Sequence, residues 1–232
     1  MKKITTLFLV VMTLCFIACS SESEETQTTS VQSNELITQG RKFANIHNDC
    51  LENIYNSLIS SKTRSTSTHK FSKSEVVKAA NQYIAQHVSK TRANADENYI
   101  TEKTYEISIE DIREQIPEYE LNYIEKILST DGNNENILKD IINDNKLTIS
   151  KKKAIICFST TYNASSEYWQ KNIYKWNNNI KKVPVTRAIR FNWKEVAFAD
   201  AYWGYTGMLS SGLNVWVGGG AAAVGSALSC LK

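Results

Sequence analysis

The sequence predicts an all-α protein, an irregular helical bundle that ends in a Gly/Ala-rich helix pair. Three observations favour this fold class. The 232 residues contain only two prolines, Pro117 and Pro184. Asn-Gly and Asp-Gly pairs, which are typical of β-hairpin turns, are nearly absent. Apolar residues recur every three to four positions over long stretches, so each of these segments can present one apolar face as a helix.

The N-terminus predicts export. Lys2 and Lys3 precede an apolar run over 4–17, which has the length of a signal peptide and is short for a membrane span. The run ends in Ala18-Cys19, which resembles the lipobox of bacterial lipoproteins, where the cysteine carries the lipid. We therefore expect a lipoprotein signal peptide at 1–18, lipidation of Cys19, and a place in the outer membrane or at the cell surface. Secretion with cleavage nearby is the alternative.

Residues 19–39 predict a disordered tether, because Ser, Thr, Gln and Glu dominate and apolar residues are few. The acidic, serine-rich start of this segment, at 20–25, resembles the surface-export signal of Bacteroidetes lipoproteins. A helical domain at 40–192 and a Gly-rich apolar helical tail at 193–232 are expected to follow.

Five helices are expected in the helical domain. The second opens with a capping box, in which the side chains of Ser72 and Glu75 each accept a hydrogen bond from the other's backbone amide. The third is bent or broken at Pro117, since proline lacks an amide donor. The five helices are expected at about 41–58, from 72 onward, and at about 108–128, 137–142 and 150–176. Two more, at about 192–209 and 213–228, form the tail.

The closing stretch, "GLNVWVGGGAAAVGSALSCLK", is uncharged up to its last residue. Its length permits a membrane span, but glycine and serine lower its hydrophobicity. The three glycines at 218–220 disfavour a free helix by ~1 kcal/mol each, so the helix needs a close neighbour. Gly218, Ala222 and Ser226 form a ridge of small residues at the four-residue spacing that permits close packing. We expect a helix pair packed on the domain, with facing positions at Ala197, Ala201 and Gly204; membrane insertion and an oligomer contact are the alternatives.

Charge divides the chain. Residues 1–144 hold 15 basic and 21 acidic side chains, whereas residues 145–232 hold 12 basic and 3 acidic ones. Either the two halves attract each other in the folded domain, or a basic surface meets phosphates of lipid or another anionic partner. The candidate membrane or partner contacts are Lys171, Lys175, Lys181, Lys182, Arg187, Arg190 and Lys194, together with Gly218, Gly219, Gly220 and Gly225.

No catalytic, cofactor or metal motif is found in the sequence. His47 is expected to open the first helix, where a capping role is favoured over a catalytic one. His87 is expected to lie on an apolar helix face as a core histidine. A site assembled from distant carboxylates stays open. Cys50, Cys157 and Cys230 are expected to be small buried hydrophobes, with one disulfide and one free thiol as the alternative.

Three short segments resemble an uncharacterised family of Bacteroidetes lipoproteins. They are His47-Asn48-x-x-Leu51, Ser165-x-x-Tyr168-Trp169, and Ala199-Asp200-Ala201 before the Gly-rich tail. The family has no established activity, so the resemblance implies fold and location only.

The sequence as a whole favours a lipid-anchored binding module without catalysis, whose partner is a protein or a glycan. Export argues against nucleic acid as a partner, and an oligomer through the tail is an open possibility. The alternative is a membrane-active toxin, because a cationic aromatic stretch before a Gly-rich apolar tail is similar to the layout of class II bacteriocins.

Overall fold

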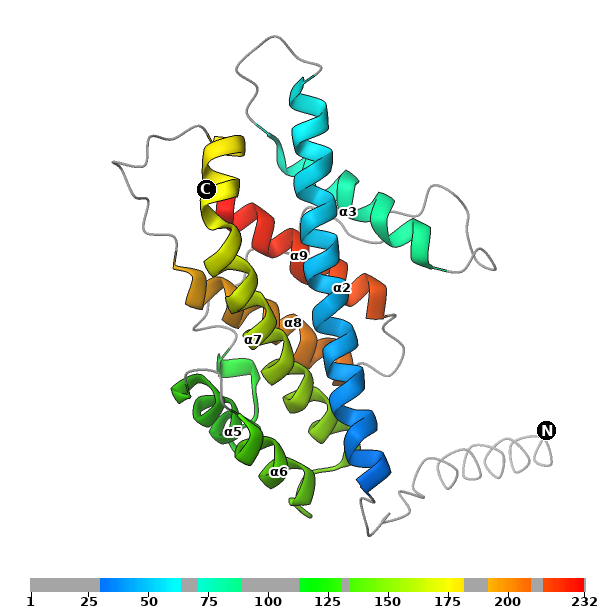
Figure 1. Ribbon diagram of the computed structural model, residues 1–232. Helices are drawn as coiled ribbons and strands as arrows, with labels where there is room; N and C mark the ends of the chain where they lie inside the picture. Colours follow the sequence, from blue (N-terminus) through cyan, green and yellow to red (C-terminus); the bar gives the residue numbers. More distant parts are fainter. Residues whose placement is uncertain are drawn as a thin grey trace, which may run out of the picture.

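The computed structural model describes residues 30–63, 71–88, 113–130, 134–181, 192–209 and 215–231 (Figure 1). All regular structure in these ranges is helical, which confirms the predicted fold class. The expected signal peptide and Cys19 lie outside these ranges. The elements are α2 (Ser30–Thr63), α3 (Lys73–His87), α5 (Glu118–Ser129), α6 (Glu135–Asn143), α7 (Ile149–Trp176), a π-helical turn η3 (Asn177–Lys181), α8 (Trp193–Leu209) and α9 (Val215–Leu231).

The two long helices α2 and α7 lie side by side and run in the same direction (Figure 1). Gly40 permits their close approach, because a Cβ at this position would lie 2.7 Å from Thr160 Oγ1. Further along the seam, Asn48 Nδ2 donates to the carbonyl oxygen of Ala164 at 3.2 Å. The helices α2 and α7 are therefore in close contact, and each of the other described helices packs on one or both of them.

The helix α2 begins at Ser30, so the prediction of a tether up to residue 39 was wrong for residues 30–39. Leu36 is 4% exposed and belongs to a core cluster with α5, α6, α7 and α8. Burial of this apolar face outweighs the polar composition of the segment, because most helix stability in proteins comes from packing.

The capping box at the start of α3 is confirmed. Ser72 Oγ accepts from the Glu75 amide at 3.3 Å, and Glu75 Oε2 accepts from the Ser72 amide at 2.7 Å. The predicted break at Pro117 is confirmed as well, since Pro117 is the N-cap of α5 and a short helical turn at 113–115 precedes it. The predicted start of the third helix, at 108, lies outside the described residues.

The helices α8 and α9 cross the seam of α2 and α7, where α8 packs mainly on α7, α9 packs mainly on α2, and the two pack on each other (Figure 1). The boundary expected at residue 192 therefore does not separate the tail from the domain. In α9, Gly218, Gly219, Gly220 and the alanines at 221–223 are all buried. A Cβ at Gly219 would lie 2.7 Å from Ile46 Cγ2 of α2, so this glycine sets the closest approach of the two helices.

The predicted facing positions of the tail were wrong in detail. A Cβ at Gly204 would lie 3.0 Å from Cys157 Sγ and from Thr161 Oγ1, so Gly204 faces α7 and not α9. Ala197 and Ala201 belong to the cluster with α5, α6 and α7, which includes no α9 residue. The helices α8 and α9 instead meet through a polar contact between Asp200 and Ser226.

Among the described helices, none combines the length and the apolar character that a membrane crossing requires.

Candidate functional site

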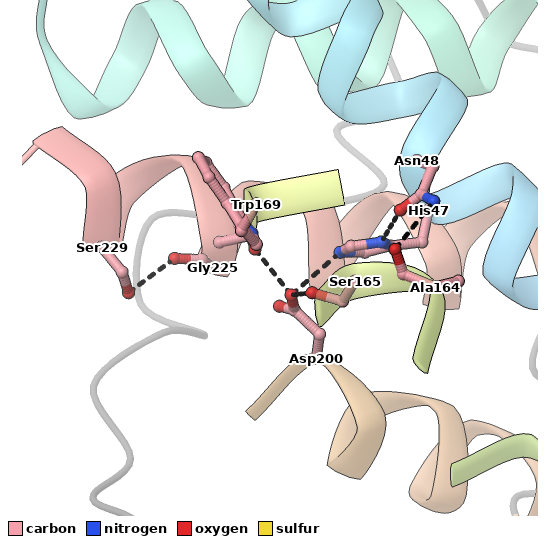
Figure 2. A network of polar contacts seen from close by, with 9 residues as sticks. His47, Asn48, Ala164, Ser165, Trp169, Asp200, Gly225 and Ser229 are labelled. Atoms are coloured by element: carbon pink, nitrogen blue, oxygen red, sulfur yellow. Dashed lines mark hydrogen bonds and ion pairs between the residues drawn. The ribbon is translucent and has the colours of Figure 1, made fainter. Parts of the chain in front are cut away.

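A buried polar network joins four helices at the centre of the molecule (Figure 2). Its hub is the carboxylate of Asp200 on α8, which is 1% exposed. Asp200 Oδ2 accepts hydrogen bonds of 2.6 Å from the hydroxyls of Ser165 on α7 and Ser226 on α9. His47 Nε2 on α2 lies 3.2 Å from the same oxygen, at ion-pair distance. Trp169 Nε1 donates to Ser226 Oγ at 2.8 Å and completes the network.

Asn48 orients the ring of His47 beside Asp200. Because Asn48 Nδ2 donates to Ala164, Asn48 Oδ1 faces His47 and accepts from its Nδ1 at 2.9 Å. His47 Nε2 lies 3.2 Å from Asp200 Oδ2 without the alignment of a hydrogen bond. Asn48 therefore holds the His47 ring in place beside the buried carboxylate.

This set of residues is not a nucleophile with its base. The Ser165 hydroxyl donates to Asp200 and not to His47. A nucleophile must be hydrogen-bonded to its base, and a substrate must be able to reach it. All three side chains are at most 1% exposed. The network therefore holds four helices in position, and it is closed to substrate in this structure.

Neither histidine prediction holds. His47 lies in the middle of α2 and does not cap a helix, because α2 begins well before it. His87 is exposed at the end of α3, where the helix leaves the core. Its Nδ1 donates to the Tyr83 carbonyl oxygen at 2.8 Å, and its ring stacks on Trp216 with the centroids 4.2 Å apart.

The three segments that carry the family resemblance meet in this network. One segment supplies His47 and Asn48, the second Ser165 and Trp169, and the third Asp200 (Figure 2). Sequence reasoning did not identify Asp200 as a hub, although a signal was present. Asp200 is the single charged residue between Glu195 and Lys232. A lone carboxylate in an apolar helix requires partners if it is buried.

A polar groove with a volume of about 540 Å³ lies along the seam of α2, α6 and α7. This volume is within the ~300–1,000 Å³ that is usual for ligand sites. The groove is lined by Ile37, Arg41, Asn45 and Asn48 of α2, by Asn134, Glu135 and Leu138 at α6, and by Ser159, Thr160, Asn163, Ala164, Glu167, Tyr168, Lys171 and Asn172 of α7.

Hydrogen bonds within the protein hold several of the side chains that line the groove in place. Asn134 Nδ2 donates to Ser159 Oγ at 3.2 Å, and Thr160 Oγ1 donates to the Ile156 carbonyl oxygen at 3.0 Å. Asn48 lines the groove and also accepts the hydrogen bond from His47. The buried network therefore positions one side chain of the groove directly.

The seven cations predicted as a contact surface do not all fall in the described residues. Lys182, Arg187 and Arg190 lie outside them, and only the backbone of Lys181 is described, in η3. Lys171 is exposed at the groove and pairs with Glu167 at 3.4 Å. Lys194 is exposed, 5.5 Å from the ring centroid of Trp193. The last of the seven, Lys175, pairs with Glu52 of α2.

Two ion pairs join the basic half of the chain to the acidic half. Lys175 pairs with Glu52 and lies 4.1 Å from the ring centroid of Tyr55. Lys151 Nζ lies 2.7 Å from Oε1 of Glu120, whose side chain is fully buried. These contacts support the interpretation that the two halves attract each other in the folded domain.

The candidate glycines are used inside the fold. Gly218, Gly219 and Gly220 are buried, and Gly225 is half-buried. Cys50, Cys157 and Cys230 are buried, as predicted, and no disulfide joins them. Burial raises the pKa of Cys157 to about 12 and that of Cys50 further, so both stay protonated. Within the described residues, no group of three His, Cys, Asp or Glu side chains could hold a metal ion.

A second polar contact, centred on the carboxylate of Asp144, joins α5 to the C-terminal end of α6. The hydroxyls of Tyr119 and Tyr123 donate to Asp144 Oδ2 at 2.6 and 2.7 Å. Partial burial raises the pKa of Asp144, but these two hydrogen bonds and the amide and charge of Lys146 lower it more, so the pKa lies below its ordinary value.

No family model matches the chain, and neither a curated protein nor a solved structure is significantly similar to it.

Proposed function

We propose that the protein is an exported, lipid-anchored binding module without catalytic activity, and that the polar groove holds its partner. One observation carries this proposal. The groove opens to the surface with amide and hydroxyl side chains, whereas Ser165, His47 and Asp200 of the polar network are sealed in the core. The lipid anchor rests on the lipobox-like Ala18-Cys19.

The packing of α9 supports a binding module over a membrane-active toxin. Insertion into a bilayer would require α9 to leave the core and to give up the bond from Ser226 to Asp200. A toxin would release dye from vesicles of anionic lipid, and the release would vanish when residues 212–232 are deleted. A binding module leaves the vesicles intact at every lipid composition.

Two measurements test the proposal. Labelling of cells with an alkyne fatty acid should mark the protein and fail to mark Cys19→Ala. The soluble Cys19→Ala form should be folded by circular dichroism, bind a ligand from peptide or glycan arrays, and lose this binding when Asn45→Trp fills the groove. Asn56→Trp, on an exposed position of the same helix outside the groove lining, is the matched control. A robust hydrolase activity of the soluble form would refute the proposal.

A further inference from the structure

We propose that the groove binds an extended peptide segment of about five residues and holds it by its main chain. This inference rests on the proposed function and names the ligand of the same site. It is argued from the length of the groove, from the side chains with unused hydrogen-bonding groups, and from the balance of charge.

The length of the groove suits a short strand. On α2 its lining runs from Ile37 to Asn48, which are eleven positions apart. At 1.5 Å per helical residue this is about 17 Å. An extended chain rises about 3.3 Å per residue, so about five peptide residues span this distance.

Amide side chains with unused groups stand on two walls. Asn45 of α2 is exposed, and Asn172 of α7 donates its Nδ2 to the Tyr168 carbonyl oxygen at 2.9 Å, which leaves its Oδ1 to accept. An amide side chain offers both donor and acceptor, as does each peptide unit of an extended ligand. Asn48 and Asn134 hydrogen-bond within the protein, so the wall keeps its shape before the ligand arrives and less entropy is lost on binding.

The charges at the groove favour a ligand without net charge. Arg41 and Lys171 are matched by Glu135 and Glu167. A polyanion would gain from the two cations and lose as much to the two anions.

The large aliphatic side chains of the lining are few. Ile37 and Leu138 are partly buried and also pack on the core. An uncharged peptide with one apolar side chain fits this pattern.

A glycan fits the described lining less well. Sugar rings are usually held by stacking on an open aromatic face, and Tyr168, the aromatic residue of the lining, is 8% exposed. Its hydroxyl is also used, since it accepts from Trp176 Nε1 at 3.1 Å.

The test uses the full chain in detergent and fluorescent pentapeptides, capped at both ends, made of Ser, Thr and Gly with one Leu at each position in turn. Fluorescence polarisation should detect binding. N-methylation of alternate peptide nitrogens should abolish it, while exchange of Ser for Thr should change Kd by less than about twofold. Asn45→Ala and Asn172→Ala should each weaken binding by about three- to tenfold, the effect of one net hydrogen bond. Asn56→Ala, with the same chemical change outside the groove lining, should leave Kd within about twofold.

The outcomes separate the inference from the proposed function. Binding that is indifferent to N-methylation, or unchanged in both groove variants, overturns main-chain recognition. Binding of a glycan library with the same dependence on Asn45 and Asn172, while the peptides fail, overturns the peptide ligand and leaves the binding module standing. If neither library binds to variants and wild type that are equally folded by circular dichroism, both proposals fall.

Discussion

One carboxylate oxygen, Asp200 Oδ2, receives two hydroxyl hydrogens and faces an imidazole nitrogen, all without access to water. Removing this carboxylate leaves His47, Ser165 and Ser226 without their common acceptor inside the core. Loss of one member of such a buried group is strongly destabilising. We expect Asp200→Ala to lower the free energy of unfolding by about 3–5 kcal/mol in urea denaturation.

The control for this substitution is Asp49→Ala, which removes an exposed carboxylate from α2. It should change the free energy of unfolding by no more than about 0.5 kcal/mol. Equal effects of the two substitutions would contradict the central role of Asp200.

The three buried thiols should be inert in the folded protein. Only the thiolate reacts with iodoacetamide, and burial raises the pKa of Cys157 to about 12. Peptide mapping by mass spectrometry after alkylation at pH 8 should find Cys50, Cys157 and Cys230 unmodified, and all three modified in 8 M urea. Rapid modification of Cys157 without urea would show that α7 and α8 open around it.

At the scale of single residues, the sequence predicted that the three cysteines are buried, but it did not predict the contact between His47 and Asp200. The buried thiols follow from their apolar neighbours in the helical pattern. The pairing of His47 with Asp200 could not be predicted, because 153 positions separate them and only the packing of α2 on α8 and α9 brings them together. The groove was equally hidden, since it combines side chains of α2 and α7 that lie more than 100 positions apart.

Among the elements, α9 is the helix whose packing relies on glycine, because Gly219 lies against Ile46 of α2. Gly219→Ala would place a Cβ 2.7 Å from Ile46 Cγ2. We expect a loss of about 1–3 kcal/mol from overpacking, reduced by up to ~1 kcal/mol because alanine favours the helix. Urea denaturation measures the sum.

A double-mutant cycle isolates the steric cause. In an Ile46→Ala background the obstructing Cγ2 is gone, so Gly219→Ala should cost nothing or stabilise the protein. If the cost persists in this background, the close contact of α9 with α2 is not its cause.

The link between α5 and α6 should weaken in acid. The pKa of Asp144 lies below its ordinary value of 3.8, so its ionised form is favoured by folding. The stabilisation is therefore present above pH 3.8 and is lost as the pH falls through the lowered pKa. The free energy of unfolding of the wild type should exceed that of Asp144→Asn by up to about 1 kcal/mol at pH 6, because the site is largely exposed.

Urea titrations from pH 6 to pH 2 check this expectation. The difference between wild type and Asp144→Asn should shrink toward zero at the acid end. Glu114→Gln, which changes an exposed carboxylate before Pro117, should show no comparable trend.

Helix positions were predictable where local chemistry marks them. Ser72 and Glu75 fix the start of α3, and Pro117 fixes the start of α5. The start of α2 was missed, because its first residues are polar and only the burial of Leu36 against distant helices identifies them as part of the fold. The helix α9 was placed correctly, but its neighbour at the closest contact is Ile46 and not the predicted Gly204.

At the scale of the whole molecule, two core clusters share the helices α2, α7 and α8. One cluster includes Trp169 and Trp176 of α7 with α2, α3 and α9, and the other includes Phe158 of α7 with α5, α6 and α8. Because both clusters depend on α7, neither should survive the loss of the other. Tryptophan fluorescence and far-UV circular dichroism should therefore give coincident urea transitions. Two separated transitions would show that the clusters fold independently.

The position of α9 has a consequence for how the chain is made. Residues 215–231 leave the ribosome after every other described segment, yet they supply the buried middle of the molecule. A growing polypeptide that lacks them has no Ser226 to donate to Asp200 and cannot complete the cluster that contains α9. This part of the core can form only when translation is nearly complete, and such a delay would suit the export that we propose.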